Sequence, residues 1–430
     1  MSVLFMLISF LLLMLIGIPL SFVLAISGIF YLLLNLNVIP WQIIAIRLFA
    51  GSNNFVLLAV PFFILAGNLF NKAGIAKKLI RFAQSLVGYM RGGLAMVNVV
   101  VSMLFAGCTG AAIAETSAIG TILIPAMVDE GYELDYSCGI TAVASTIGPI
   151  IPPSIAFVLY GSIAGVSIGK LFIAGIIPGI LLGVFQMIVA YYYALKKNYP
   201  KKKFVSIKYF FKELQAAFID AIPGLMVPVI ILGGIISGIF TPTEAAAISV
   251  FYIALLGMIF YKTISFSDLK KILIESAISS GAVMILVSTA YLFGYALSRE
   301  RVAMKLANYL IESDLPLWII LMMINAFLLI IGMLMDSSPA IIILTPVLAP
   351  ALVALGLHPV HIGVIIVLNL VIGLSTPPVG VCLFMASTIG KAPLEDVFKA
   401  SVPFTLASIF VLLLVTYLPF ITTFLPAIFT

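Results

Sequence analysis

Long apolar runs, separated by short polar stretches, make up most of the chain. Five of them, at 4–34, 171–195, 218–240, 272–297 and 400–426, are almost free of charged residues. A helix of about 20 apolar residues crosses the roughly 30 Å hydrocarbon core of a bilayer. The pattern therefore predicts an all-α polytopic membrane protein in which the first run, 4–34, forms the first span.

Two further runs are broken in the middle by glycine and a proline pair. STIGPIIPPSIAFVLYGS begins at 145, and LVIGLSTPPVGVCLFMAS begins at 370. The separation of 225 positions between Pro152 and Pro377 recurs in other pairs: Pro125 with Pro350, Gly131 with Gly356, Gly148 with Gly373, Ser162 with Ser387, Gly165 with Gly390 and Pro178 with Pro403. This register indicates a duplicated chain. Paired interruptions in the two halves of a membrane protein point to the binding site of a secondary transporter.

Basic residues gather in two places, at 72–91 and in a linker at 196–215. The positive-inside rule places both in the cytoplasm, so an even number of crossings must separate them. Four apolar pieces lie between them. The count is even if the first two, 93–106 and 113–128, form a re-entrant hairpin whose tip is GCTGAA, Gly107 to Ala112.

The same separation predicts a second hairpin at 317–355, with Asp336, Ser337 and Ser338 at its tip. An odd number of crossings between the two hairpins inverts the second repeat. We therefore predict two inverted repeats, each with a re-entrant hairpin and a Gly/Pro-broken transmembrane helix. Their predicted bounds are 1–195 and 216–430, each including scaffold helices, with the Lys-rich cytoplasmic linker 196–215 between them.

The two tips and the two kinks, Gly148–Ser154 and Gly373–Gly380, carry the predicted chemistry. Backbone groups freed at membrane depth cost several kcal/mol each unless they line a cavity or bind a ligand. Freed carbonyls with Ser and Thr hydroxyls suit Na⁺, and helix N-termini suit a carboxylate. We expect two cation sites, each pairing a tip with a kink, and an anionic substrate between them. The candidate Na⁺ ligands are Cys108, Thr109, Gly110, Gly148, Pro149, Pro152, Ser154, Asp336, Ser337, Ser338, Gly373, Ser375, Thr376 and Gly380, and the candidate substrate ligands are Thr109, Ala111, Ser154, Asp336, Ser337 and Thr376.

Composition narrows the function classes. Hydrophobic residues make up 63% of the chain and charged residues 9%, so the net charge of +6 reflects cytoplasmic loops rather than a nucleic-acid partner. No HExxH pair, Walker loop or activated nucleophile is present, so we expect no enzyme activity, no cofactor and no metal other than Na⁺. Glu115 and Glu244 are interpreted as residues that cap or neutralise helix ends.

Several long blocks resemble one transporter family. They are LIPAMVDEGYELDYSCGITAVASTIGPIIPPSIAFVLYGS, LFIAGIIPGILLG, SGIFTPTEAAAISVFYIALL, IGIPLSFVLAISG and LMDSSPAIIILTPVLAP. Together they are similar to the large membrane subunit (M subunit, DctM-like) of tripartite ATP-independent periplasmic (TRAP) transporters. The resemblance covers essentially the whole chain.

This resemblance implies a Na⁺-driven importer of an organic acid, such as a C4-dicarboxylate, sialic acid or another sugar or keto acid. It implies an elevator mechanism related to the ion transporter superfamily, in the bacterial cytoplasmic (inner) membrane. The implied partners are a periplasmic solute-binding protein and a small four-helix membrane subunit, which we expect to be a separate chain. The alternative is a stand-alone Na⁺- or H⁺-coupled dicarboxylate or anion carrier of similar inverted-hairpin architecture that needs no binding protein.

Overall fold

The computed structural model describes residues 2–37, 39–201 and 206–429, except the side chains of Cys108 and Thr109. Within these residues the chain is helical and contains no strand, only an isolated bridge between Arg91 and Lys201. The first-half helices are α1 Ser2–Leu15, α2 Leu20–Leu33, α3 Ile43–Ser52, α4 Ala59–Lys72, α5 Ile75–Val87, α6 Gly93–Thr109, α7 Ala112–Asp129, α8 Leu134–Ala144, α9 Ile155–Ala164 and α10 Ile168–Lys196. Short helical segments, η1 Phe55–Leu58 and η2 Ser145–Ile147, precede α4 and follow α8.

The second half follows the linker, whose lysines at 202 and 203 lie outside the described residues. Its helices are α11 Ile207–Ile236, α12 Pro242–Leu255, α13 Phe266–Arg299, α14 Val302–Glu312, α15 Leu317–Leu334, α16 Ser337–Ala354, α17 Pro359–Gly373, α18 Val381–Gly390, α19 Leu394–Tyr417 and α20 Phe420–Phe429. A π-helical segment, η3 Leu256–Phe260, extends α12.

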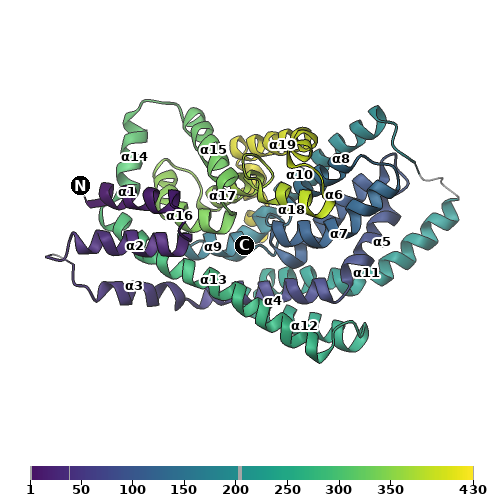
Figure 1. Cartoon of the computed structure of the whole chain (residues 1–430), viewed down its shortest axis with the longest axis horizontal. Helices are drawn as coiled ribbons and strands as arrows, with labels where there is room; N and C mark the ends of the chain where they lie inside the picture. Colours follow the sequence, from purple (N-terminus) through teal and green to yellow (C-terminus); the bar gives the residue numbers. More distant parts are fainter. Residues whose placement is uncertain (1, 38, 202–205, 430) are drawn as a thin grey trace.

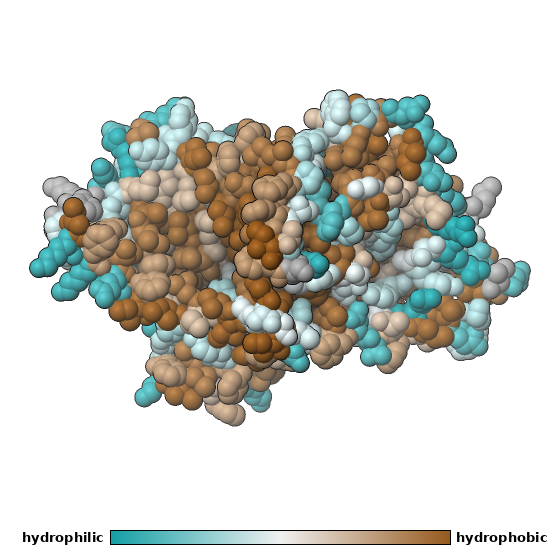
Figure 2. Space-filling view, turned by 180° about the vertical axis from the view of Figure 1, so that it is seen from behind, coloured by the Kyte–Doolittle hydropathy of each residue, from teal (hydrophilic) through white to brown (hydrophobic). Residues whose placement is uncertain are grey.

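Nine helices in the described part of the chain are long and apolar enough to cross a membrane. Large apolar side chains such as Leu15, Phe251 and Phe266 are exposed, where a soluble protein would carry polar ones. Figure 2 shows an apolar band across the middle of one face, with hydrophilic residues gathered at its left and right ends. This distribution is that of a multi-pass membrane protein.

The expectation of a single span at 4–34 is wrong. The structure divides this run into α1 and α2, which pack against each other. Gly17 between them has a φ of +84°, a conformation that glycine adopts without a steric penalty. Pro19 has no backbone N–H to continue α1, and α2 begins at the next residue. The apolar pattern alone hides this turn.

Local capping explains where two long helices of the second half begin. Thr241 and Glu244 form a capping box at the start of α12, as Ser265 and Asp268 do at the start of α13. The interpretation of Glu244 as a capping residue is therefore confirmed. Asp268 also lies 3.3 Å from Lys72 at the end of α4, so this ion pair joins the N-terminal end of α13 to the basic cluster.

The helices form two groups. The long α13 packs against α2, α3 and α4, and α4 packs against α12; these helices follow the lower edge of Figure 1. The second group contains α6–α10 and α15–α20, with contacts between α7 and α18, α8 and α19, α9 and α16, and α15 and α17. Fewer contacts join the groups, among them α13 with α16 and α4 with α9. We call the first set of helices the α13 group and the second set the hairpin group.

Candidate functional site

Helices of the hairpin group recur at the separation found in the sequence. Helix α7 covers 112–129 and α16 covers 337–354, so both ends differ by 225 positions. The helices that follow begin at 134 and 359, again 225 positions apart. Each broken segment contains a cis peptide bond, Pro152–Pro153 in the first and Pro377–Pro378 in the second. The two halves thus begin these helices at matching positions, and each break contains a cis Pro–Pro bond at the same place.

The first tip is shorter than the sequence predicts. Helix α6 continues through Gly107 to Thr109, and only Gly110 and Ala111 separate it from α7. Gly110 has a φ of +61°, and a Cβ atom there would lie 2.7 Å from the carbonyl oxygen of Pro153. Only glycine allows this approach, which places the first tip directly on the first kink. The predicted ligands Cys108 and Thr109 have side chains outside the described structure.

The first kink is stabilised by Ser154. Its buried hydroxyl accepts a hydrogen bond from the backbone N–H of Phe157 at 3.2 Å and donates one to the carbonyl of Pro149. Ser154 is therefore the N-cap of α9, and it also pairs a carbonyl that the proline break has freed. Gly148, Pro149 and Pro152 are buried around it.

The hydroxyls of the second kink bond differently. Ser375 and Thr376 both donate to the carbonyl of Ile372, each at 2.9 Å. Gly373 packs against Gly332 of α15, since a Cβ at Gly373 would lie 2.4 Å from the Gly332 carbonyl carbon. Gly380 ends the kink with a φ of +51°. The second kink thus contacts the first arm of its hairpin through two glycines.

The second tip consists of Asp336 and the first turn of α16. Asp336 is the N-cap, and its Oδ1 accepts a hydrogen bond from the backbone N–H of Ser337 at 2.7 Å. A cavity of ≈ 60 Å³ joins this tip to the first tip and first kink. Its lining residues are Gly110, Ala111, Ala112, Ile113, Pro149, Ile155, Ala156, Asp336, Ser337 and Ser338. We call it the tip cavity.

The tip cavity combines residues that the sequence analysis assigned to two separate cation sites. It is lined by the N-terminal ends of α7, α9 and α16, but not by Ser375 or Thr376. The second kink leads into α18, which packs against α7. The three N-terminal ends carry partial positive charge toward one small space.

Glu115 contributes more to this region than the sequence suggests. It is fully buried in the first turn of α7, and neither carboxylate oxygen has a hydrogen-bond partner within the described residues. A Cβ added at Gly148 would lie 2.2 Å from Oε2, so the carboxylate lies against the first kink. The buried Ser102 hydroxyl lies close to the Glu115 carboxylate. A buried, unpartnered carboxylate is costly unless a cation or a proton joins it, so Glu115 is a candidate to bind either one.

Family membership follows from comparison with known proteins. The family model described as "Tripartite ATP-independent periplasmic transporter, DctM component" matches residues 7–421. The chain belongs to this family, the large permease subunit of TRAP transporters. It is 41% identical to a C4-dicarboxylate TRAP transporter large permease protein of Pseudomonas aeruginosa, over 89% of both chains. It is 39% identical to a sialic acid TRAP transporter large permease protein of Vibrio cholerae, over 96% of both chains.

A further relative of this TRAP permease is longer. The isethionate TRAP transporter permease protein DctMQ of Oleidesulfovibrio alaskensis is 38% identical over 96% of this chain, which spans 65% of that protein. Among solved structures, the YdaH transporter of Alcanivorax borkumensis matches with a TM-score of 0.62 at 15% identity, covering 89% of this chain and 86% of that one. MtrF of Neisseria gonorrhoeae matches with the same score at 12% identity, covering 87% and 83%. These two likenesses concern the fold alone.

Single substitutions at the kinks of the TRAP permease should have unequal effects. Ser154→Ala removes a cap and leaves the Pro149 carbonyl unpaired, so we expect a loss of about 1–2 kcal/mol of stability and a weaker apparent Na⁺ affinity. Thr376→Val keeps the shape and removes only a bond to a carbonyl that Ser375 also contacts. Thr376→Val should therefore lower stability and apparent Na⁺ affinity less than Ser154→Ala does. Thermal inactivation and uptake at varied Na⁺ measure them; equal effects of both variants would contradict the assignment.

Proposed function

We propose that this permease couples Na⁺ entry to the import of an organic acid. The observation that carries the proposal is the tip cavity, where two tips and one kink meet at Asp336, with the buried Glu115 carboxylate against the same kink. Carbonyl and carboxylate oxygens are suitable ligands for a hard cation, and the N-terminal ends of α7, α9 and α16 favour a carboxylate. Na⁺ bound near the two acidic residues offsets their charge, and a substrate carboxylate can then approach the helix ends.

The size of the tip cavity limits what it holds in this conformation. Ligand pockets for whole small molecules are about 300–1,000 Å³, whereas the tip cavity is ≈ 60 Å³. It accommodates ions or one carboxylate group, so the rest of the substrate must lie in an adjoining space or enter when the helices move. The contacts between the α13 group and the hairpin group are the natural place for that movement, and we propose an elevator motion of the hairpin group there.

The matching helix boundaries support two inverted repeats. Lys72, Arg91 and Lys197 lie at ends that the positive-inside rule places in the cytoplasm, so hairpin α6–α7 enters from that side. Hairpin α15–α16 then enters from the periplasm. Each hairpin arm has 17 or 18 residues. The domain division at 1–195, 196–215 and 216–430 follows this repeat. The proposed location is the bacterial inner membrane.

Energetics favour at least two cations per cycle. Concentrating a solute a thousandfold costs about 4 kcal/mol, and moving a monoanion into a negative interior costs about 2.3 kcal/mol more per 100 mV. One Na⁺ supplies about 2.3 kcal/mol per 100 mV and about 1.4 kcal/mol per decade of its gradient. One ion is therefore too few, and two suffice. The two acidic residues near the tip cavity are consistent with this number.

The proposed partners are a periplasmic solute-binding protein and a separate small four-helix membrane subunit. The relatives' names include C4-dicarboxylate, sialic acid and isethionate, and all three are organic anions. We propose the same broad substrate class for this chain. The second candidate is a stand-alone anion carrier of similar inverted-hairpin architecture.

Reconstitution distinguishes the two candidates. The chain is placed in liposomes alone, with the small subunit, or with the small subunit and binding protein, and uptake of succinate, N-acetylneuraminate and isethionate is measured. We expect uptake only in the complete mixture, with a Hill slope above one for Na⁺ and an inward current. Uptake by the chain alone would favour the stand-alone carrier. A slope near one without current would contradict coupling to several cations.

A further inference from the structure

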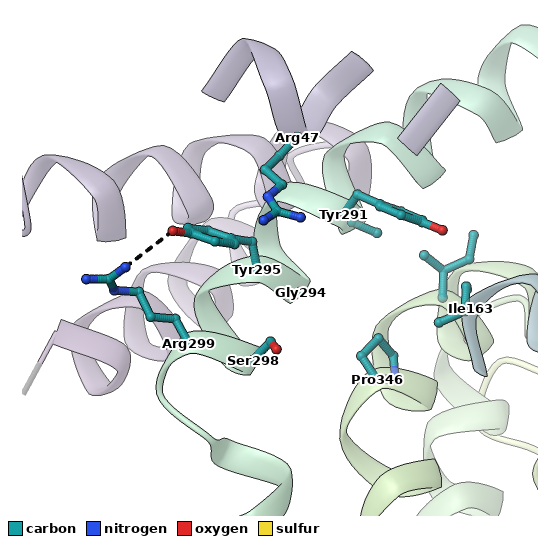
Figure 3. A pocket seen from close by; sticks show the side chains of 10 residues that line it. Arg47, Ile163, Tyr291, Gly294, Tyr295, Ser298, Arg299 and Pro346 are labelled. Atoms are coloured by element: carbon teal, nitrogen blue, oxygen red, sulfur yellow. Dashed lines mark hydrogen bonds between the residues drawn. The ribbon is translucent and has the colours of Figure 1, made fainter. Parts of the chain in front are cut away.

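A second, larger cavity of ≈ 470 Å³ lies where the two helix groups meet. Arg47 of α3 and Tyr291, Tyr295 and Arg299 of α13 line one side. Ile163 of α9 and Pro346 of α16 line the other side, as Figure 3 shows. Its volume lies within the range of about 300–1,000 Å³ that small-molecule pockets occupy. Two adjoining cavities, of ≈ 550 and ≈ 680 Å³, share Lys170 in their linings, and the larger of them also shares Ile163 and Pro346 with the first.

Tyr295 holds both arginines of this cavity. The Arg47 guanidinium carbon lies 4.4 Å from the centre of the Tyr295 ring, and Arg299 Nη1 donates to the Tyr295 hydroxyl at 3.4 Å. Figure 3 shows Arg47 above the ring and Arg299 beside its hydroxyl. Neither arginine forms an ion pair with an acidic residue in the described part of the chain. Most guanidinium N–H donors therefore remain available to a ligand.

The three cavities have an unusual charge balance. Arg47, Arg299 and Lys170 line them, and no aspartate or glutamate of the described residues does. The nearest acidic residue in sequence, Glu300, accepts a hydrogen bond from Tyr31 at 3.0 Å and lies 4.0 Å from Lys305. Arg47 is half-buried in an apolar helix, and its Nε has no partner among the described residues. An arginine in an apolar helix with no acidic partner points to a functional role.

We propose that Arg47 and Arg299 form an anion-binding vestibule that receives the carboxylate of the transported solute before it reaches the tip cavity. The proposal rests on the proposed transport function and identifies residues outside the tips and kinks. Guanidinium groups bind carboxylates through two parallel hydrogen bonds, and a cleft lined by one sign of charge concentrates the opposite ion. Succinate and N-acetylneuraminate carry carboxylates, and isethionate carries a sulfonate, whose oxygens can occupy the same place.

The vestibule and the tip cavity are lined by different parts of the same two helices. Ile155 at the start of α9 lines the tip cavity, whereas Ile163 near its end lines the vestibule. On α16, Ser337 and Pro346 have the same relation. A helix rises about 1.5 Å per residue, so eight or nine residues separate the two spaces by about 12–14 Å. Arg299 lies at the C-terminal end of α13, whose N-terminal end is paired with Lys72 of the basic cluster. The vestibule is therefore on the side opposite the basic clusters, and we assign that side to the periplasm.

A thiol-labelling experiment tests the charge of the vestibule without a transport assay. Ser298→Cys places a thiol in its lining. The rate of labelling by an anionic methanethiosulfonate and the rate by a cationic one are each divided by the rate at which the same reagent labels a free thiol. The ratio of these two normalised rates is the quantity compared, and the chain without Ser298→Cys gives the background. We expect the normalised ratio to favour the anionic reagent and Arg47→Gln to lower it about tenfold, within the range for electrostatic focusing. The exposed Lys271 lies near the other end of α13 and outside the cavity lining, so Lys271→Gln should leave the ratio unchanged. An equal ratio in the parent and Arg47→Gln chains would overturn the proposal.

Uptake by the reconstituted complex tests the transport step. For whichever of the three anions is taken up, Arg47→Gln should raise KM about tenfold and leave the Hill slope for Na⁺ and the maximal rate unchanged. If no anion is taken up by the parent complex, the proposed function fails, whereas the labelling result still decides the charge of the vestibule. An unchanged KM would overturn its role in transport.

An anionic lipid headgroup would engage the same guanidinium groups. Labelling in vesicles of zwitterionic lipid is therefore compared with labelling in vesicles that also contain phosphatidylglycerol. We expect the same preference for the anionic reagent in both. Loss of the preference only with phosphatidylglycerol would assign the site to lipid and overturn the proposal.

Discussion

Asp336→Asn should abolish Na⁺-dependent uptake at physiological Na⁺. Asp336 is the carboxylate at the second tip and lines the tip cavity with Gly110 and Pro149. The amide keeps the size of the side chain and still accepts the hydrogen bond from the Ser337 N–H. It removes the negative charge that balances a bound cation. Removing one partner of a buried charge pair costs about 3–5 kcal/mol, so apparent Na⁺ affinity should fall at least a hundredfold.

The control for this substitution is Asp314→Asn. Asp314 is exposed in the loop before α15, and its φ of +52° is one that asparagine also tolerates. It carries the same charge but lies outside the tip cavity lining. Uptake at increasing Na⁺, with protein amount in the membrane measured in parallel, compares the two variants. Normal Na⁺ dependence of Asp336→Asn would remove this residue from the proposed cation site.

For Glu115, the sequence indicates only a structural role, whereas its surroundings in the structure indicate a further one. An acidic residue in the first turn of a helix commonly stabilises the N-terminal end, and the sequence gives no sign of another role for Glu115. The structure places its unpartnered carboxylate against Gly148, a contact between residues far apart in the chain. The local sequence pattern indicates that a helix starts near Glu115, but it does not show that Gly148 lies next to the carboxylate. The proposed cation binding would use this carboxylate, whereas capping of α7 would not explain its contact with Gly148.

The sequence is most informative where backbone chemistry sets the structure. Helix α6 ends at Gly110, because a left-handed glycine is a common C-cap, and α16 begins after Asp336, because aspartate is a favourable N-cap. The turn at Gly17 was missed because the flanking residues are apolar on both sides, and hydropathy does not detect a turn between two apolar helices. The vestibule was missed for another reason. Arg299 lies one helical turn after Tyr295, but Arg47 is distant in sequence, and only the packing of α3 on α13 brings it to Tyr295.

Gly373→Ala should strongly impair both folding and transport. A Cβ at this position would lie 2.4 Å from the carbonyl carbon and 2.5 Å from the Cα of Gly332, so it would meet backbone rather than a movable side chain. Helices α15 and α17 would have to separate, which would displace the second tip and second kink together. Overpacking costs about 1–3 kcal/mol, and this rigid contact should be at the upper end.

The matched control is Gly281→Ala in α13. Gly281 is exposed, and an added Cβ there meets no heavy atom within 4 Å. Alanine favours a helix over glycine by about 1 kcal/mol, so this variant should be unchanged or slightly more stable. Thermal inactivation in detergent measures stability, and uptake is normalised to folded protein. If Gly373→Ala matches Gly281→Ala in both assays, α15 and α17 can separate without cost, and the close glycine contact does not position the second tip for cation binding.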